Sequence, residues 1–506
     1  MVKVEIVYPP GPSSKVPGKM LRQFLRDPLK TFFDIATEYG DISHFRLGKK
    51  DSYLINNPDY IEKILIYDHR IFKKGQRLQT AKRMLGEGLV TSEGKMHDNQ
   101  KRFIHPFFIP KKINSFGPIM SGYAVEMCNQ WKNGSVIDIH KEMTTVTFSI
   151  ICKAMMDYDM RTSEDAQKFV NSFTSLKKYS NRLQHPLGRI LDNISILPKV
   201  AENKRAEKTM NDIVYQLISQ KRNETSNNNT VKPTSSSKSE SKVDLLSGLL
   251  EIQVQQQQHL HDGKTNDDDG DSNDETSSMM DKQIRDHLIT MLIAGHETTA
   301  NALTWTYYLL AQHPEIEKKL FEEIDSILST KTQTQQQNAT PENNTRKLNR
   351  SYRNVTSSDV PKLKYVEKVF REAMRLYPPV WTIGRIVEEE YKIGDYTIPK
   401  ESALFMSQYV MHRNPKYYDN PEVFNPDRWT DEFKRQLPRF SYFPFGGGLR
   451  GCIGEPFAWQ EGIMLITTIS SYWKMNLHPD QKVKIDHGAT LNPKNGIKMI
   501  LEARNN

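Results

Sequence analysis

The sequence is poor in cysteine and contains no long apolar run. Only Cys128, Cys152 and Cys452 occur among its 506 residues. Three scattered cysteines are too few for a disulfide framework or a four-cysteine metal site, so any cysteine chemistry must use a single thiol. No apolar stretch approaches the roughly 20 residues that a membrane-spanning helix requires, which excludes a polytopic membrane protein.

Targeting signals and clustered charge are also missing. Residues 1–10 have neither the apolar core of a signal peptide nor the Arg-rich pattern of a transit peptide, so we expect a cytoplasmic protein. The formal net charge is +9, but the 70 basic residues are spread along the chain among 61 acidic ones. No basic stretch is interleaved with aromatic residues, which argues against nucleic-acid binding and favours a local basic patch for an acidic protein partner.

Two segments of biased composition interrupt an otherwise globular chain. The first covers about residues 222–278 and contains Asn, Ser and Gln runs and an acidic run. The second covers about residues 331–358. We expect both to be solvated insertions without a chemical role. The remainder is long enough to bury a deep site and predicts a single domain over residues 1–506.

Apolar residues at helical spacing dominate the rest of the chain. The spacing predicts a long, central helix from Ile284 to Leu310, which ends before His313 and Pro314. Alternating residues around turn signals predict hairpins at 43–55 and 391–399. Further helices are predicted at residues 314–328, 363–376 and 455–472.

A Gly-rich loop at residues 445–454 carries Cys452 directly before the predicted helix that begins near Glu455. A thiol in that place meets unpaired backbone N–H groups and a favourable helix dipole, which lower its pKa. Such a thiol is a ligand or a nucleophile, the glycines let a flat cofactor approach, and Arg450 supplies a cation for an acidic group. A buried, inert cysteine on a glycine turn is the alternative.

The middle of the long helix holds the sequence Ala294–Thr299, with Gly295 and Glu297. Gly costs about 1 kcal/mol relative to Ala inside a helix, and a buried Glu is expensive, so both need a reason. Small residues open a groove beside the helix, into which a Thr hydroxyl and a carboxylate can pass protons. A helix-packing site with a solvent-facing Glu remains the alternative, and His296 is expected to be a packing or surface residue.

A charge network is the third candidate. Glu372 and Arg375 share one face of a predicted helix. The Pro-bounded turn 421–429 adds Arg428, which can join the pair in a buried network.

Together these motifs resemble the cytochrome P450 superfamily of haem-thiolate monooxygenases. The signature loop is complete at Phe445, Gly448, Arg450, Cys452 and Gly454. The oxygen-activation motif Ala294–Thr298, the pair Glu372 and Arg375, and the turn with Arg428 stand in the family's order. The resemblance covers the chain from Pro9 to Gly496 apart from the two insertions.

The resemblance implies a mainly α fold with small antiparallel β-sheets and a haem b (iron protoporphyrin IX) cofactor. Cys452 would be the axial ligand of the haem iron, while Thr298 and Glu297 would deliver protons to dioxygen, and Glu372, Arg375 and Arg428 would form a structural network. The other residues that would contact the haem, several of them through its propionates, are Arg450, Arg385, His97, Lys101, Phe445, Gly446 and Ala294. His97 and Lys101 stand where the family often has Trp and Arg.

The implied reaction inserts one oxygen atom from O2 into an apolar small molecule. A long-chain fatty acid is preferred over a terpenoid or a sterol. The pocket would be lined by Met84, Leu89, Ala294, Val380, Trp381, Thr382, Ala489 and Thr490. The family's N-terminal anchor is absent, so we expect no transmembrane anchor, and we expect a monomer.

Electrons would come from a ferredoxin or flavodoxin type donor with its reductase. The expected docking surface is basic and includes Lys95, Lys101, Arg102 and Arg439. Two alternatives remain open at this point: a haem-thiolate enzyme that uses peroxide or rearranges lipids, and a non-enzymatic haem sensor.

Overall fold

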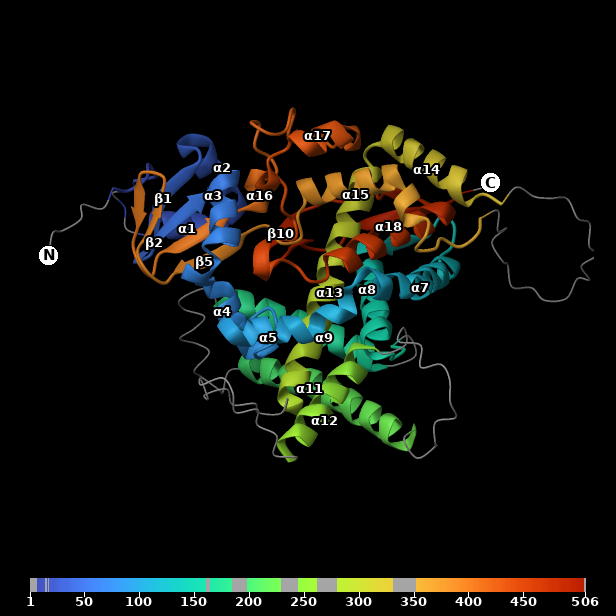
Figure 1. The fold of residues 1–506 in the computed structure, drawn as a ribbon. Coiled ribbons are helices and arrows are strands. Elements are labelled where there is room, and N and C mark those ends of the chain that lie inside the picture. The colour runs from blue at the N-terminus through green and yellow to red at the C-terminus, as the bar shows by residue number, and fades with distance from the viewer. Residues whose placement is uncertain are drawn as a thin grey trace, which may run out of the picture. The chain divides into compact units, whose positions relative to one another are not determined.

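The computed structural model describes residues 7–13, 16, 18–160, 164–183, 198–228, 244–261, 280–330 and 352–504. The chain divides into two compact units. Figure 1 shows the helices and strands of the described residues. Unit 1 comprises Met1–Phe72, Ile113–Ile150 and His296–Asn506, and unit 2 comprises Lys73–Lys112 and Ile151–Gly295. The single haem-binding domain expected from the sequence stays a prediction.

Unit 1 contains most of the strands and several helices. Its helices are α1 (Lys19–Arg26), α2 (Pro28–Tyr39), α3 (Pro58–Glu62), η1 (Lys63–Tyr67), η2 (His69–Ile71), α7 (Gly117–Gln130), α14 (Pro314–Leu328), η5 (Val360–Lys362), α15 (Lys364–Leu376), α16 (Gln408–Met411), η6 (Pro426–Arg428), α17 (Asp431–Gln436), η7 (Arg439–Ser441), η8 (Gly448–Arg450) and α18 (Glu455–Tyr472). Its strands are β1 (Ile42–Leu47), β2 (Lys50–Ile55), β4 (Val136–Asp138), β5 (Ile383–Val387), β6 (Tyr391–Ile393), β7 (Tyr396–Ile398), β8 (Ala403–Met406), β9 (Trp473–Leu477), β10 (Ile485–His487), β11 (Leu491–Pro493) and β12 (Lys498–Ala503). Four elements cross from one unit into the other, namely β3 (Phe72–Lys74), α6 (Pro110–Ser115), α8 (Ile139–Met156) and α13 (Asp281–Leu310).

The largest sheet has the strand order β1-β2-β8-β5-β3. β1 and β2 form the predicted hairpin, in which Ile42 is paired with Ile55. β2 and β8 are parallel, with Ser52 opposite Ala403. This sheet is therefore mixed, whereas the expected sheets were antiparallel. The smaller sheets, β4-β12-β9, β10-β11 and β6-β7, are antiparallel.

Alternation along β2 explains how this sheet builds two cores. Successive side chains of a strand point to opposite faces. Tyr53 and Ile55 therefore join a core cluster with Ile61 and Leu65 of the α3–η1 segment. Leu54 joins a second cluster with residues of α2, such as Phe32. The sheet is thus covered on both faces within unit 1.

Unit 2 is helical in the part that the structure describes. Its helices are α4 (Gln76–Leu85), α5 (Gly94–Ile104), η3 (His105–Phe108), α9 (Glu164–Leu183), α11 (Pro198–Asn228) and α12 (Leu245–His261). Asp286 of α13 is 1% exposed and accepts hydrogen bonds from the Glu87 backbone N–H at 2.9 Å and from Arg285 at 2.6 Å. Gly86 lies against this carboxylate with a φ of +67°, where a Cβ atom would approach it to 2.1 Å. The α4–α5 loop is therefore fixed to α13.

Most predicted elements are confirmed. The helices predicted at 314–328 and 455–472 have those bounds, and the helix at 363–376 begins one residue later. Within the first expected insertion the structure describes residues 222–228 and 244–261: α12 reaches His261, and Gln253 is buried and hydrogen-bonded to Arg222. Most of the second insertion, residues 331–351, lies outside the described residues. None of the helices in the described ranges combines the length and the apolar character that crossing a bilayer requires.

Glu317 at the start of α14 provides a pH-dependent contribution to stability. Its side chain is buried in unit 1, and burial raises its pKa from 4.5 to about 7. Between these values the unfolded chain loses the proton while the folded protein keeps it, so stability falls as the pH rises. We expect Glu317→Gln to match the wild type at pH 4 and to be more stable by about 3 kcal/mol at pH 8, at about 1.4 kcal/mol for each unit of pKa. Urea unfolding at both pH values measures this difference, and equal curves at pH 8 would contradict it.

Candidate functional site

The Gly-rich loop of unit 1 presents Cys452 at the surface. Cys452 is exposed, and its backbone N–H donates to the Phe445 carbonyl oxygen at 2.9 Å, which closes the loop. Gly448 has a φ of +70°, and a Cβ atom there would lie 2.2 Å from the Leu65 carbonyl oxygen of η1. Only glycine fits at this position, because any side chain would push the loop away from η1.

Cys452 lies just before the start of α18. α18 begins at Glu455 after Gly454, whose lack of a side chain leaves the first N–H groups of the helix without a side-chain cap. Those groups and the helix dipole stabilise a negative charge placed before them. Cys128 and Cys152 are completely buried, and burial raises the pKa of both thiols. Cys452 is therefore the cysteine suited to bind a metal.

Two arginines of unit 1 are held by backbone carbonyl groups. Arg450 Nη1 donates to the Phe72 carbonyl oxygen at 2.6 Å. Arg385 of β5 is 7% exposed, and its Nη1 donates to the Gly384 carbonyl oxygen at 3.0 Å. Phe445 lies beside the α18 residue Trp459, with the ring centroids 5.9 Å apart. Fixed guanidinium groups of this kind suit the carboxylates of a ligand.

α13 is less buried at the oxygen-activation motif that the sequence predicts. Most residues before and after this point are buried, but Ala294 is exposed and Glu297 and Thr298 are half-buried. His296 points elsewhere, because its buried ring packs edge-on against Phe148 at 5.2 Å. Of the packing or surface position expected for His296, the structure shows the packing one. The break in burial shows open space beside this turn of the helix.

Glu297 has a partner that the sequence does not indicate. Thr490 Oγ1 donates to Glu297 Oε1 at 2.6 Å. The family resemblance places Thr490 only among the residues of the substrate pocket. No short-range pattern reveals this contact, since 193 residues separate the two side chains.

The charged residues behind the loop form one network. Glu372 and Arg375 are 0% exposed and make two hydrogen bonds of 2.8 Å. Glu372 also accepts from Arg428 Nε at 2.9 Å and from Trp429 Nε1 at 2.8 Å. Arg375 Nη1 donates to the carbonyl oxygen of His412 at 2.8 Å. A buried ion pair is tolerated when its remaining groups are satisfied in this way.

The pocket residues predicted from unit 1 do not all face open space. Trp381 is 0% exposed and packs in the core cluster with Phe32 and Leu491, and its Nε1 donates to the Gly488 carbonyl oxygen. Trp381 therefore packs into the core, while its neighbours Val380 and Thr382 are half-exposed. The pocket role of this segment stays a prediction. Ala489 is exposed and remains a candidate.

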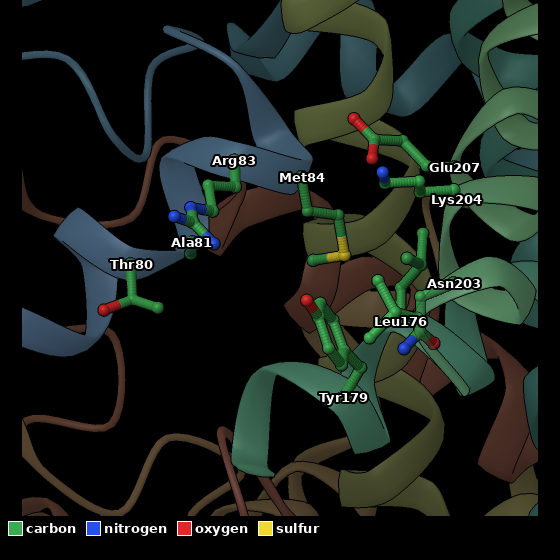
Figure 2. A pocket seen from close by; sticks show the side chains of 10 residues that line it. Thr80, Ala81, Arg83, Met84, Leu176, Tyr179, Asn203, Lys204 and Glu207 are labelled. Atoms are coloured by element: carbon green, nitrogen blue, oxygen red, sulfur yellow. The ribbon is translucent and has the colours of Figure 1, made fainter. Parts of the chain in front are cut away.

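The remaining predicted residues belong to unit 2. His97 and Lys101 lie one turn apart on α5, and His97 is 5% exposed with its Nδ1 3.2 Å from Asp98. Leu89 is buried in the α4–α5 loop. Met84 lines a cavity of about 210 Å³ (Figure 2). The other residues that line this cavity come from α4, α9 and α11 and are Thr80, Ala81, Arg83, Leu176, Tyr179, Val200, Asn203, Lys204 and Glu207.

Comparison with known proteins decides the family. The family model for cytochrome P450 matches residues 9–501. The chain belongs to the cytochrome P450 family. Its members are haem-thiolate oxidoreductases with monooxygenase activity, and their cofactor is haem b. The chain is therefore an oxidoreductase of this type.

The relatives share the family over nearly their whole length. Cyclooctatin synthase of Streptomyces melanosporofaciens is 28% identical over 91% of this chain and 88% of that protein. Pentalenene oxygenase of Streptomyces avermitilis is 26% identical over 95% of this chain and 94% of that protein. The crystal structure of the cytochrome P450DA haem domain has a TM-score of 0.75, with 21% identity over 99% of this chain and 98% of that chain. It confirms the fold.

The residues of this P450 fit the cofactor. Haem needs one axial donor and cations for its two propionates. The exposed Cys452 thiol on a turn that only glycine can form, together with the fixed Arg450 and Arg385, provides such a donor set.

Proposed function

We propose that the protein inserts one oxygen atom from O2 into an apolar small molecule, with electrons supplied by a separate redox protein. The exposed Cys452 thiol at the start of α18 is the observation that carries this proposal. Bound there, haem supplies the chemistry of dioxygen activation, and thiolate ligation favours O–O cleavage.

The other residues hold the cofactor or move protons. Arg450 and Arg385, together with the more distantly matching His97 and Lys101, bind the propionates, and Phe445 packs near the Cys452 sulfur. Gly446 and Ala294 leave room for the macrocycle, since neither has a bulky side chain. The carboxylate of Glu297 and the hydroxyl of Thr298 deliver protons to the oxygen-binding side, and their half-buried position on α13 supports this role.

Two sources indicate which class of substrate the protein oxidises. The motifs of the sequence favour a long-chain fatty acid. Two relatives are named for other compounds, pentalenene and cyclooctat-9-en-7-ol, the names of a hydrocarbon and an alcohol. Fatty acids and the compounds in these two names are all largely apolar, which matches the mostly apolar pocket residues that the sequence predicts. An absorption titration of the holoenzyme with fatty acids, terpenes and sterols tests these classes, because a compound that enters the site would change the surroundings of the haem and shift its absorption band.

Thr298→Ala tests the proton-delivery role. We expect the variant still to consume NADH but to release most of the reducing equivalents as hydrogen peroxide, because it lacks a hydroxyl for proton transfer. The loss of product should be about 100-fold, at the lower end of the contribution of one general acid–base group. The measurement compares product and peroxide formed per NADH, using a ferredoxin or flavodoxin, its reductase and the compound found by titration.

Thr306→Ala is the matched control. Thr306 lies on the same helix but is completely buried, and its hydroxyl donates to the Ala302 carbonyl oxygen at 2.7 Å. This variant should keep the coupling of the wild type. Unchanged coupling in Thr298→Ala would remove Thr298 from the proton path.

A further inference from the structure

A hydrogen bond joins the proposed proton-delivering carboxylate to a distant turn. Thr490 Oγ1 and Glu297 Oε1 are 2.6 Å apart, a length typical of a hydroxyl that donates to a carboxylate. Thr490 is 7% exposed and lies in the turn between β10 and β11. Both residues belong to unit 1.

The turn is held in place independently of Glu297. Trp381 Nε1 donates to the Gly488 carbonyl oxygen at 3.1 Å, two residues before Thr490. On the other side, the Leu491 backbone N–H donates to the Pro379 carbonyl oxygen at 2.9 Å. The Leu491 side chain is 0% exposed. The position of the Thr490 hydroxyl therefore does not depend on its bond to the Glu297 carboxylate.

The helix that carries Glu297 also holds this turn. Trp305 Nε1 donates to the Leu491 carbonyl oxygen at 3.1 Å. Trp305 lies about two turns after Glu297 on α13, since a turn has about 3.6 residues. Its ring is completely buried and stacks on Tyr377, with centroids 4.2 Å apart. The bond from Trp305 thus holds α13 and the turn together, and Thr490 adds a bond from the turn to the Glu297 carboxylate.

We propose that Thr490 is a positioning residue that holds the Glu297 carboxylate in the orientation from which it delivers protons. This inference rests on the proposed role of Glu297. A glutamate on a half-open surface otherwise samples several rotamers. A misplacement of about 1 Å at a reacting group can cost about 100-fold in rate.

The test uses holoenzyme without added substrate, so that it does not depend on the unknown compound. An infrared difference spectrum between the wild type and Glu297→Gln assigns the carboxylate band of Glu297. Thr490→Val, which keeps the shape but removes the hydroxyl, should shift this band. It should also slow NADH oxidation with ferredoxin and its reductase about threefold to tenfold and change the solvent deuterium isotope effect. Thr490→Ser should restore the band and the isotope effect.

Thermal unfolding and a double variant separate positioning from a structural role. Glu297→Ala combined with Thr490→Val should oxidise NADH no more slowly than Glu297→Ala alone, because the hydroxyl then has no carboxylate to hold. An unchanged carboxylate band in Thr490→Val overturns the proposal. A shifted band together with wild-type NADH oxidation in Glu297→Ala refutes instead the role of Glu297 on which the proposal rests.

Discussion

Replacement of Cys452 by serine should abolish thiolate ligation and with it the monooxygenase reaction. A serine oxygen is a harder ligand than a thiolate sulfur, so it would not donate electron density to the iron as a thiolate does. We expect product formation to fall by at least about 1000-fold, which corresponds to about 4 kcal/mol of barrier. The measurement combines turnover with the absorption spectrum of the reduced, carbon monoxide-bound protein, whose thiolate-dependent band should disappear.

Cys128→Ala is the control for this experiment. Cys128 is also free but 0% exposed, and burial raises the pKa of its thiol, so it contributes packing alone. The variant should lose some stability and keep the thiolate band. Retention of that band in Cys452→Ser would show that another residue binds the iron.

Glu372→Ala should prevent the accumulation of folded protein. The substitution leaves the 0% exposed Arg375 guanidinium without its carboxylate, and also removes the acceptor of Arg428 Nε and Trp429 Nε1. Breaking a buried ion pair from one side costs about 3 to 5 kcal/mol, a large share of the 5 to 15 kcal/mol that typically stabilises a domain. Urea unfolding, or the yield of soluble haem protein where unfolding is complete, measures this loss.

A surface ion pair close to this network is the matched comparison. Lys319 Nζ and Asp427 Oδ2 are 2.7 Å apart, and both side chains are about half exposed. Asp427→Asn should change stability by about 0.5 kcal/mol or less, because solvent screens such pairs. Similar effects of the two substitutions would contradict a special role for the buried network.

The sequence predicted most accurately the features that depend on residues close together in the chain. Helical spacing and a proline together bounded α14, and the Gly394 turn located the hairpin of β6 and β7. The functional motifs were identified because each is short: Cys452 lies two residues from Arg450, and Glu372 three from Arg375. Neighbours of this kind share a loop or a helix face whatever the rest of the fold is.

Contacts between distant segments were not predictable from one sequence. Nothing near Ser52 indicates that its strand pairs in parallel with β8. The same holds for Thr490 and Glu297, where a polar side chain in a turn gives no sign of its partner. The burial of Trp381 in the core was not predictable either, because the resemblance located the segment but not the direction of each side chain along it.

The strand order of unit 1 also bears on how the protein is made. The β1-β2 hairpin is synthesised early, but its next strand, β8, ends only at Met406. Domains tend to fold as they leave the ribosome, and an unpaired strand edge invites aggregation. The edge of β2 must therefore remain protected while several hundred further residues are added. Cys452 leaves the ribosome later still, because it follows β8 in the chain.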